Sequence, residues 1–134
     1  MYEWGDLSKM PTIQHFEIPA DDVDRAQKFY KNTFGWDMQK KSNPENPEKD
    51  YWHFETKDDD GNKGIGGGMM KRQSPHHTVT NYVTVSSIDE YSTKLENAGG
   101  KVIIPKTEIP DMEIYLIFLD TENNMFGLFE EHGK

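Results

Sequence analysis

Residues 18–36 read IPADDVDRAQKFYKNTFGW, and residues 83–101 read VTVSSIDEYSTKLENAGGK. The two stretches align without a gap at an offset of 65 residues. The pairs that keep register are Ile18 with Val83, Val23 with Ile88, Asp24 with Asp89, and Gly35 with Gly100. The same offset lays YWHFE at 51–55 on LIFLD at 116–120. One offset kept across three segments indicates a duplicated module.

Each copy has the pattern of a β-α-β-β-β unit. Residues 12–18 alternate as in a half-buried strand, which places His15 and Glu17 on one face. Asp21 and Asp22 are candidate N-caps of a helix with an apolar stripe from Val23 to Phe34, and Gly35 follows as its stop. In the second copy, residues 78–85 predict a strand. Ser86 or Ser87 is the candidate N-cap of a second helix, and NAGG at 97–100 is expected to end that helix. Later strands are predicted near 36–41, 51–57, 64–70, 101–105, 116–120 and 125–131.

Composition narrows the class of protein. The chain has 134 residues, no cysteine and a formal net charge of −9. We therefore expect one domain over residues 1–134, with module one at about 11–70 and module two at about 76–131. The acidic balance disfavours nucleic acid, which requires a basic face. Without an apolar run of 18 residues or the pattern of a secretory signal, no membrane association is expected and a cytoplasmic location is favoured.

Three stretches resemble the vicinal oxygen chelate superfamily, which contains glyoxalase I, bleomycin resistance proteins and extradiol dioxygenases. HFEIPADDVDRAQKFYKNTFGW at 15–36 resembles the family's first strand and helix, and NYVTVSSIDEYSTKLENAGGKVI at 81–103 resembles the opening of its second module. FLDTENNMFGLFE at 118–130 is similar to the family's terminal D-P-x-G-N-x-F-G-L-x-E, with Thr121 for the proline and Asn123 for the glycine. The resemblance implies an α+β fold of two tandem β-α-β-β-β modules that form one curved mixed sheet around a cleft. It also implies a homodimer.

Metal-using members of this superfamily carry four ligand positions on their inner strands. By the resemblance, these positions fall on His15, on Thr80, within Gly66, Gly67 and Gly68, and on Gly127. Only His15 has a donor side chain suited to a divalent cation, which needs three or more protein donors. We therefore expect no metal and no other cofactor.

The glycine run GIGGGMM at 64–70 is a further signal. It is not a dinucleotide fingerprint, because G-x-G-x-x-G is not satisfied and no helix follows. It is not a P-loop either, because no Gly-Lys-Ser/Thr closes it. Glycine within a strand indicates a bulge or the close approach of another group. Two interpretations stay open: the missing side chains enlarge a ligand cavity, or they admit neighbouring backbone or a dimer partner.

The remaining candidates for chemistry are polar residues expected in the cleft. His15 and Glu17 can form a general base with an orienting partner, and His53 and Tyr82 can face the same cleft. The predicted ligand cleft therefore comprises His15, Glu17, His53, Gly66, Gly67, Gly68, Thr80, Tyr82 and Gly127. His76 and His77, between the modules, are expected to be solvated, as are Glu130 and Glu131 near the end of the chain.

Three functions compete at this point. The first is a metal-independent protein that binds an unidentified small molecule, as the bleomycin-resistance members do. The second is a divalent-metal-dependent lyase or dioxygenase of glyoxalase type. The third is a metal-free enzyme that uses His15 with Glu17. Because only His15 offers a suitable side chain at the metal positions, the metal-dependent enzyme is disfavoured. We favour the metal-independent binding protein.

Overall fold

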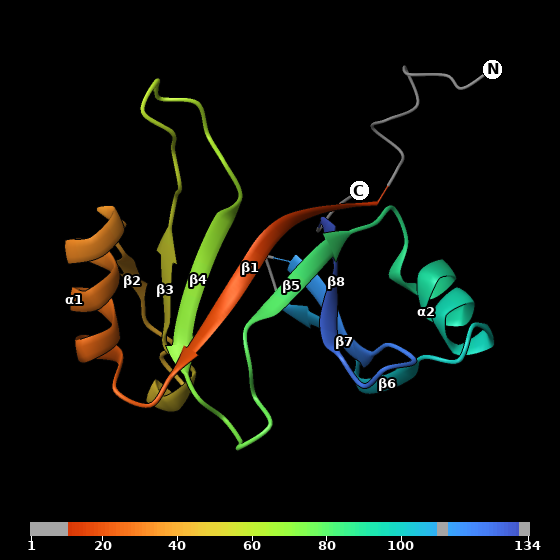
Figure 1. Cartoon of the computed structure of the whole chain (residues 1–134). Helices are drawn as coiled ribbons and strands as arrows, with labels where there is room; N and C mark the ends of the chain where they lie inside the picture. The colour runs from red at the N-terminus through yellow and green to blue at the C-terminus, as the bar shows by residue number, and fades with distance from the viewer. Residues whose placement is uncertain (1–10, 110–112, 132–134) are drawn as a thin grey trace. The chain divides into compact units, whose positions relative to one another are not determined.

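The computed structural model describes residues 11–109 and 113–131, and Figure 1 shows its two compact units. One unit comprises residues 15–80, here called module one. The other, module two, comprises the described residues from 81 onward together with residues 11–14. The boundaries therefore fall within the first strand of each module, and each of these strands is described with the module that holds most of it.

Module one is a four-stranded sheet with one long helix. Its elements are β1 (Thr12–Ala20), α1 (Val23–Phe34), β2 (Gln39–Lys41), a 3-10 turn η2 (Pro47–Lys49), β3 (Tyr51–Phe54) and β4 (Gly66–Lys71). The strand order is β2-β3-β4-β1. β1 and β4 are parallel, whereas β2 with β3 and β3 with β4 are antiparallel.

The core of module one lies between α1 and one face of this sheet. Ile18, Phe54 and Met69 are buried in it, and Val23 and Tyr30 of α1 pack against them. Because side chains alternate along a strand, the neighbours of these residues point to the face that lacks the helix. The core therefore determines which residues of module one remain available for a site.

Module two repeats the arrangement, with a shorter first strand and longer second, third and fourth strands. Its elements are β5 (Thr80–Thr84), α2 (Ile88–Asn97), β6 (Lys101–Ile109), β7 (Glu113–Leu119) and β8 (Met125–Glu131). The strand order is β5-β8-β7-β6, with β5 and β8 parallel and the other pairs antiparallel. Ile88 of α2 is fully buried against Leu116 and Leu128. The α+β class and the β-α-β-β-β order of each module are confirmed.

The helix caps follow the sequence closely. Asp22 accepts a hydrogen bond from the backbone N–H of Arg25, and Gly35 ends α1 with a left-handed φ of 75°. Ser87 accepts from the N–H of Glu90 at the start of α2. These are the roles in which aspartate, serine and glycine satisfy helix ends.

The offset of 65 residues does not hold through the third strand. In module one, His53 is paired with Gly68, and in module two Ile117 is paired with Gly127. His53 therefore corresponds to Ile117, an offset of 64, and the alignment of YWHFE with LIFLD is one residue out of register. Since a slip of one residue moves a side chain to the opposite face, this correction changes the expected counterpart of every β3 residue.

A second repeat is present in the turns that precede β4 and β8. Asp58 Oδ1 accepts from the N–H groups of Asp60 and Asn62, and Asn62 Nδ2 donates back to Asp58 Oδ2. The turn from Asp120 to Asn124 has the same hydrogen bonds: Asp120 accepts two backbone N–H groups and one amide N–H of Asn124. The fourth residue of each turn has a positive φ, 84° at Gly61 and 65° at Asn123. Asparagine tolerates this conformation better than most residues, which explains why Asn123 can stand where the family pattern has glycine.

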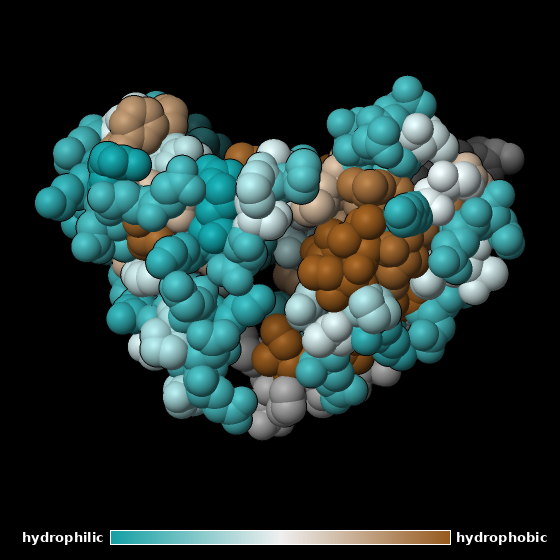
Figure 2. All heavy atoms as spheres, turned by 90° about the horizontal axis from the view of Figure 1, so that it is seen from below, coloured by the Kyte–Doolittle hydropathy of each residue, from teal (hydrophilic) through white to brown (hydrophobic). Residues whose placement is uncertain are grey.

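Several large apolar side chains remain at the surface, where Figure 2 shows brown areas among hydrophilic ones. Phe29 and Phe34 of α1 are both more than half exposed, although both lie in the apolar stripe that the sequence predicts for this helix. Phe34 is the last residue of α1. Among the residues described, no helix combines the length and the apolar composition needed to cross a membrane.

Candidate functional site

The titratable side chains of the candidate site lie on the face of module one opposite α1. His15 and Glu17 of β1 alternate with the core residues Phe16 and Ile18, as the sequence predicts. Gly68 is paired with both Glu17 and His53, which places His53 on the same face. His15, Glu17, Tyr51 and His53 thus share this face.

His15 and His53 form one part of this group together with Tyr51. His15 Nε2 lies 2.8 Å from the Tyr51 hydroxyl, and the His15 and His53 rings are 6.5 Å apart between centroids. Burial lowers the pKa of His15 below its ordinary value, while the charge of Glu17 raises it and that of His53 lowers it further. Burial also lowers the pKa of His53, and Lys41 adds to this shift. Both imidazoles are therefore neutral at pH 7.

His53 differs from its neighbours in its hydrogen bonding. Its Nε2 is buried and makes no hydrogen bond to any residue of the described part of the chain. Buried polar atoms are nearly always hydrogen-bonded to protein, water or ligand. His53 is therefore a position at which a bound group can supply the missing partner.

Glu17 is hydrogen-bonded to His77. His77 Nε2 lies 3.4 Å from Glu17 Oε1, and the two side chains are only 12% and 10% exposed. The expectation that His77 is solvated is therefore wrong, whereas His76 is exposed as expected. No motif around PHHT signals this contact, because it joins residues 60 positions apart through the path of the loop between β4 and β5.

The loop from Arg72 to His77 fixes the orientation of the His77 ring. The backbone N–H of Gln73 donates to His77 Nδ1 at 3.1 Å, so Nδ1 is unprotonated and the ring proton lies on Nε2, toward Glu17. Arg72 joins the two ends of the loop, since its guanidinium donates to the backbone carbonyl of His77. The same guanidinium donates to Asp21, which follows β1. The dyad of Glu17 and His77 is therefore built into module one.

The glycines of β4 and β8 accommodate aromatic side chains of their own module. A Cβ atom at Gly67 would overlap the ring of Phe54, one at Gly68 would overlap Tyr51, and one at Gly127 would overlap Tyr82. At these three positions the space left by the missing side chain is occupied. Gly66 and the backbone of Gly67 also line a pocket, as described below.

Among the described residues, the corresponding face of module two carries no histidine, although Glu113 of β7 lies on it. The counterparts of His15, Glu17, Tyr51 and His53 are Thr80, Tyr82, Tyr115 and Ile117. Tyr82 is buried and stacks on Phe129 at 4.4 Å between ring centroids, and the Thr80 hydroxyl donates to the carbonyl of Thr78. Of the predicted cleft residues, His15, Glu17 and His53 therefore lie together in module one, whereas Tyr82 and Gly127 belong to the packing of module two.

A pocket of about 720 Å³ opens in module one at the end of the sheet where β3 ends and β4 begins. His15, His53 and Gly66 line it from the strands, and Phe34 and Trp36 line it from the end of α1 and the segment that follows. The remaining lining residues are Gly35, Asp37, Gln39, Phe54, Glu55, Lys57 and Gly67. Its volume lies within the usual range for small-molecule sites.

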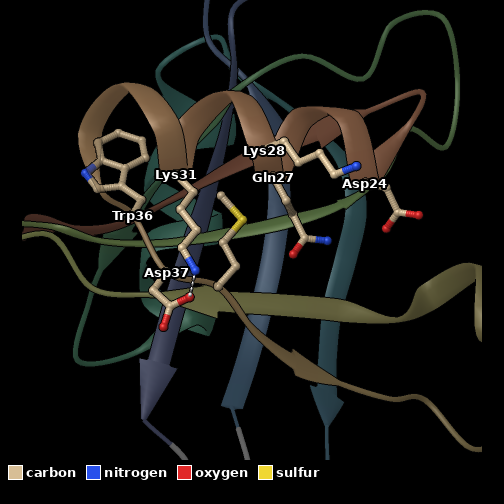
Figure 3. A pocket seen from close by; sticks show the side chains of 7 residues that line it. Asp24, Gln27, Lys28, Lys31, Trp36 and Asp37 are labelled. Atoms are coloured by element: carbon tan, nitrogen blue, oxygen red, sulfur yellow. Dashed lines mark ion pairs between the residues drawn. The ribbon is translucent and has the colours of Figure 1, made fainter.

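A second pocket, of about 340 Å³, lies beside α1 (Figure 3) and shares Trp36 and Asp37 with the first. Its walls are the α1 side chains of Asp24, Gln27, Lys28 and Lys31, together with Trp36, Asp37 and Met38. Lys31 and Asp37 form an ion pair of 3.5 Å across one end of it. It contains no histidine and no buried polar atom without a partner among the described residues, so the larger pocket is the better candidate for chemistry.

The residues at the family's metal positions do not fit a divalent cation. Gly68 and Gly127 have no donor side chain, and the hydroxyl of Thr80 is buried in a hydrogen bond to Thr78. Within residues 11–109 and 113–131, no group of three or more histidine, aspartate or glutamate side chains is arranged to hold a metal ion. His15 alone cannot supply the three donors that such a site requires.

Comparison with known proteins agrees with this fold. The sequence profile of the Glyoxalase/Bleomycin resistance protein/Dioxygenase superfamily matches residues 12–128. A glyoxylase-like domain-containing protein of Didymella fabae is 30% identical over 123 residues, which cover 91% of this chain and 95% of that protein. The chain therefore belongs to the Glyoxalase/Bleomycin resistance protein/Dioxygenase superfamily.

Solved structures with the same fold are much more distant in sequence. A methylmalonyl-CoA epimerase in complex with methylmalonyl-CoA and NH4+ has a TM-score of 0.67 and 15% identity, covering 92% of this chain and 96% of that one. A hypothetical protein from Bacillus halodurans C-125 has a TM-score of 0.69 and 11% identity, covering 94% and 98%. Since one superfamily fold supports many chemistries, these similarities establish the fold alone.

Proposed function

We propose that this protein binds a small molecule in the 720 Å³ pocket of module one, and that it does so without a resident metal. The observation that carries the proposal is His53, which lines the pocket and has a buried Nε2 without a hydrogen-bond partner in the described part of the chain. An apolar wall with a few convergent polar groups is typical of ligand sites. The complex of the structurally similar epimerase with methylmalonyl-CoA is consistent with the fold's use for small molecules.

Two measurements on the untagged protein test this function. The first is its metal content by elemental analysis, before and after incubation with nickel, zinc, iron and manganese. We expect less than stoichiometric metal in every case, and one tightly held equivalent would contradict the proposal. The second is mass spectrometry of small molecules released on denaturation, together with screening of a fragment library by NMR of the histidine ring protons.

A matched pair of variants makes the second measurement specific. His53→Ala is expected to weaken the binding of each fragment that shifts the His53 ring resonances. His76→Ala changes an exposed histidine of the same chain and is expected to leave binding unchanged. Fragments that bind equally well to both variants and to the original protein would place the site elsewhere and contradict the proposal.

A second candidate function, metal-free acid–base catalysis, is favoured by the dyad of Glu17 and His77. A buried carboxylate that accepts a hydrogen bond from a histidine of fixed tautomer can take a proton from a substrate. The partner of Glu17 in this version is His77, in place of the His15 expected from the sequence. Once a ligand is identified, its incubation with protein in D2O tests this function, with proton exchange expected for the original chain and lost in Glu17→Gln.

A further inference from the structure

One wall of the large pocket is an exposed aromatic surface. Phe34, the last residue of α1, is 60% exposed, and its ring lies 5.0 Å from that of Trp36. Trp36 stacks in turn on Phe54, with 4.9 Å between centroids and 24° between the planes. Phe34 and Trp36 both line the pocket, so aromatic side chains are available to a ligand there. Aromatic rings favour offset or edge contacts with other rings.

The pocket is also lined by two uncharged imidazoles. Burial lowers the pKa of both His15 and His53, so neither is a cation at pH 7. His15 is held by the Tyr51 hydroxyl, whereas His53 makes no hydrogen bond to any described residue. A neutral imidazole has one nitrogen that donates and one that accepts. A ligand hydroxyl or amide group therefore suits His53 in either direction.

The charged residues of the pocket do not provide a site for an anion. Its two carboxylates already have lysine partners, Asp37 with Lys31 at 3.5 Å and Glu55 with Lys63 at 3.1 Å. The only cationic side chain among the lining residues is Lys57, which is exposed. Lys41, whose charge lowers the pKa of His53, is exposed as well. A ligand carboxylate or phosphate buried against the two neutral imidazoles would therefore have only solvent-exposed cations nearby, and burying an unpaired charge is costly.

We infer that the large pocket takes an uncharged, planar ring compound bearing a hydroxyl or amide group, with the ring against Phe34 and Trp36 and the polar group on His53. This inference rests on the proposed function and specifies its ligand class. The polar group supplies the hydrogen bond that His53 lacks within the described chain, and the ring covers the exposed face of Phe34. Among the described residues, neither the small pocket beside α1 nor module two offers this combination.

Four probes at pH 7 separate the features of such a ligand. They are 2-naphthol, naphthalene, 2-naphthoate and cyclohexanol, with affinities measured by NMR titration of the full chain. We expect 2-naphthol to bind at least about tenfold more tightly than each of the others, since one well-placed hydrogen bond or one ring contact corresponds to roughly that factor. Naphthalene lacks the polar group, 2-naphthoate carries a charge, and cyclohexanol lacks the flat ring.

Variants test separately the contribution of the histidine and of the aromatic side chains to binding. His53→Phe keeps a ring of similar size but no polar atom, and we expect it to reduce the affinity for 2-naphthol to about that for naphthalene. Phe34→Ala is expected to weaken 2-naphthol and naphthalene together, while His76→Ala leaves all four affinities unchanged.

The outcomes distinguish the ligand class from the proposed function. Tighter binding of 2-naphthoate or cyclohexanol, still dependent on His53, overturns the ligand class and leaves the function standing. Equal binding of 2-naphthol to His53→Phe and to the original chain also overturns the ligand class. If neither these probes nor any library fragment binds in a way that depends on His53, both the ligand class and the proposed function are wrong.

Discussion

His77 Nε2 lies 3.4 Å from Glu17 Oε1, and both side chains are nearly enclosed within module one. Removing the histidine as His77→Ala leaves a buried carboxylate without its partner. We expect this variant to lose about 1–3 kcal/mol of the free energy of unfolding, measured by urea denaturation. The control His76→Ala should stay within about 0.5 kcal/mol of the original chain.

A double variant tests whether the two residues act as a pair. Glu17→Gln with His77→Ala should cost less than the sum of the two single changes, because each single change already breaks the same hydrogen bond. Additive costs would mean that the side chains stabilise module one independently.

The glycines beside the aromatic rings give a second prediction. Gly68→Ala and Gly127→Ala each place a methyl group into the ring of Tyr51 or Tyr82, and each should cost about 1–3 kcal/mol by overpacking. Chemical denaturation measures the loss, with the exposed Ser86→Ala as the control. If Gly127→Ala left the free energy of unfolding unchanged, the space next to Tyr82 would be open.

Glu130 gives a third prediction, because its role differs from the one expected. The sequence suggested a solvated residue near the end of the chain, but Glu130 Oε1 accepts a hydrogen bond of 2.7 Å from the backbone N–H of Ile88, at the start of α2. Glu130→Ala should therefore cost about 0.5–2 kcal/mol, as the loss of a helix cap does. The exposed Glu45→Ala is the matched control, and equal stability of the two variants would argue against a capping role.

Acidification provides a fourth prediction through His15 and His53. The pKa of each is lowered in the folded protein, so the unfolded chain binds protons first as pH falls below the ordinary histidine value of about 6.5. Stability should therefore decline from about pH 6.5 downward, until the folded protein also becomes protonated at these two residues. His53→Gln should flatten the decline measured by denaturation at several pH values, and an unchanged profile in a variant lacking both histidines would refute this assignment.

The two equivalent turns permit a fifth prediction. Replacing DTENN at 120–124 with DDDGN, the sequence of 58–62, keeps every side chain that makes the shared hydrogen bonds. Since glycine adopts the positive φ of position 123 without strain, the free energy of unfolding should change by less than about 1 kcal/mol. A large loss would mean that Thr121 or Glu122 has a role beyond the turn.

The fold was largely predictable because its signals are local. Asp22, Ser87 and Gly35 occupy the cap positions that the sequence indicates, and the alternation in β1 correctly places His15 with Glu17. The register of β3 was not predictable to one residue, since YWHFE and LIFLD are apolar or aromatic at nearly every position. The pairing of His53 with Gly68 in module one, and of Ile117 with Gly127 in module two, decides which side chains face the helix.

The candidate site was predictable only in part. Its strand residues follow from periodicity, but His77 and Phe34 do not. His77 reaches Glu17 through a loop whose path depends on the hydrogen bonds of Arg72 and Gln73. Phe34 belongs to an apolar helical stripe, and only its position at the last turn of α1 leaves it exposed beside the pocket.

The difference between the two copies has a consequence for inferring function from relatives. Gly68 and Gly127 occupy equivalent places and serve the same packing, whereas their strand partners Glu17 and Tyr82 differ in kind. Overall percentage identity therefore mixes positions that maintain the scaffold with positions that determine what the protein recognises. Grouping homologues by the residues they carry at positions 15, 17, 53 and 77 should separate those that share this chemistry from those that share only the scaffold.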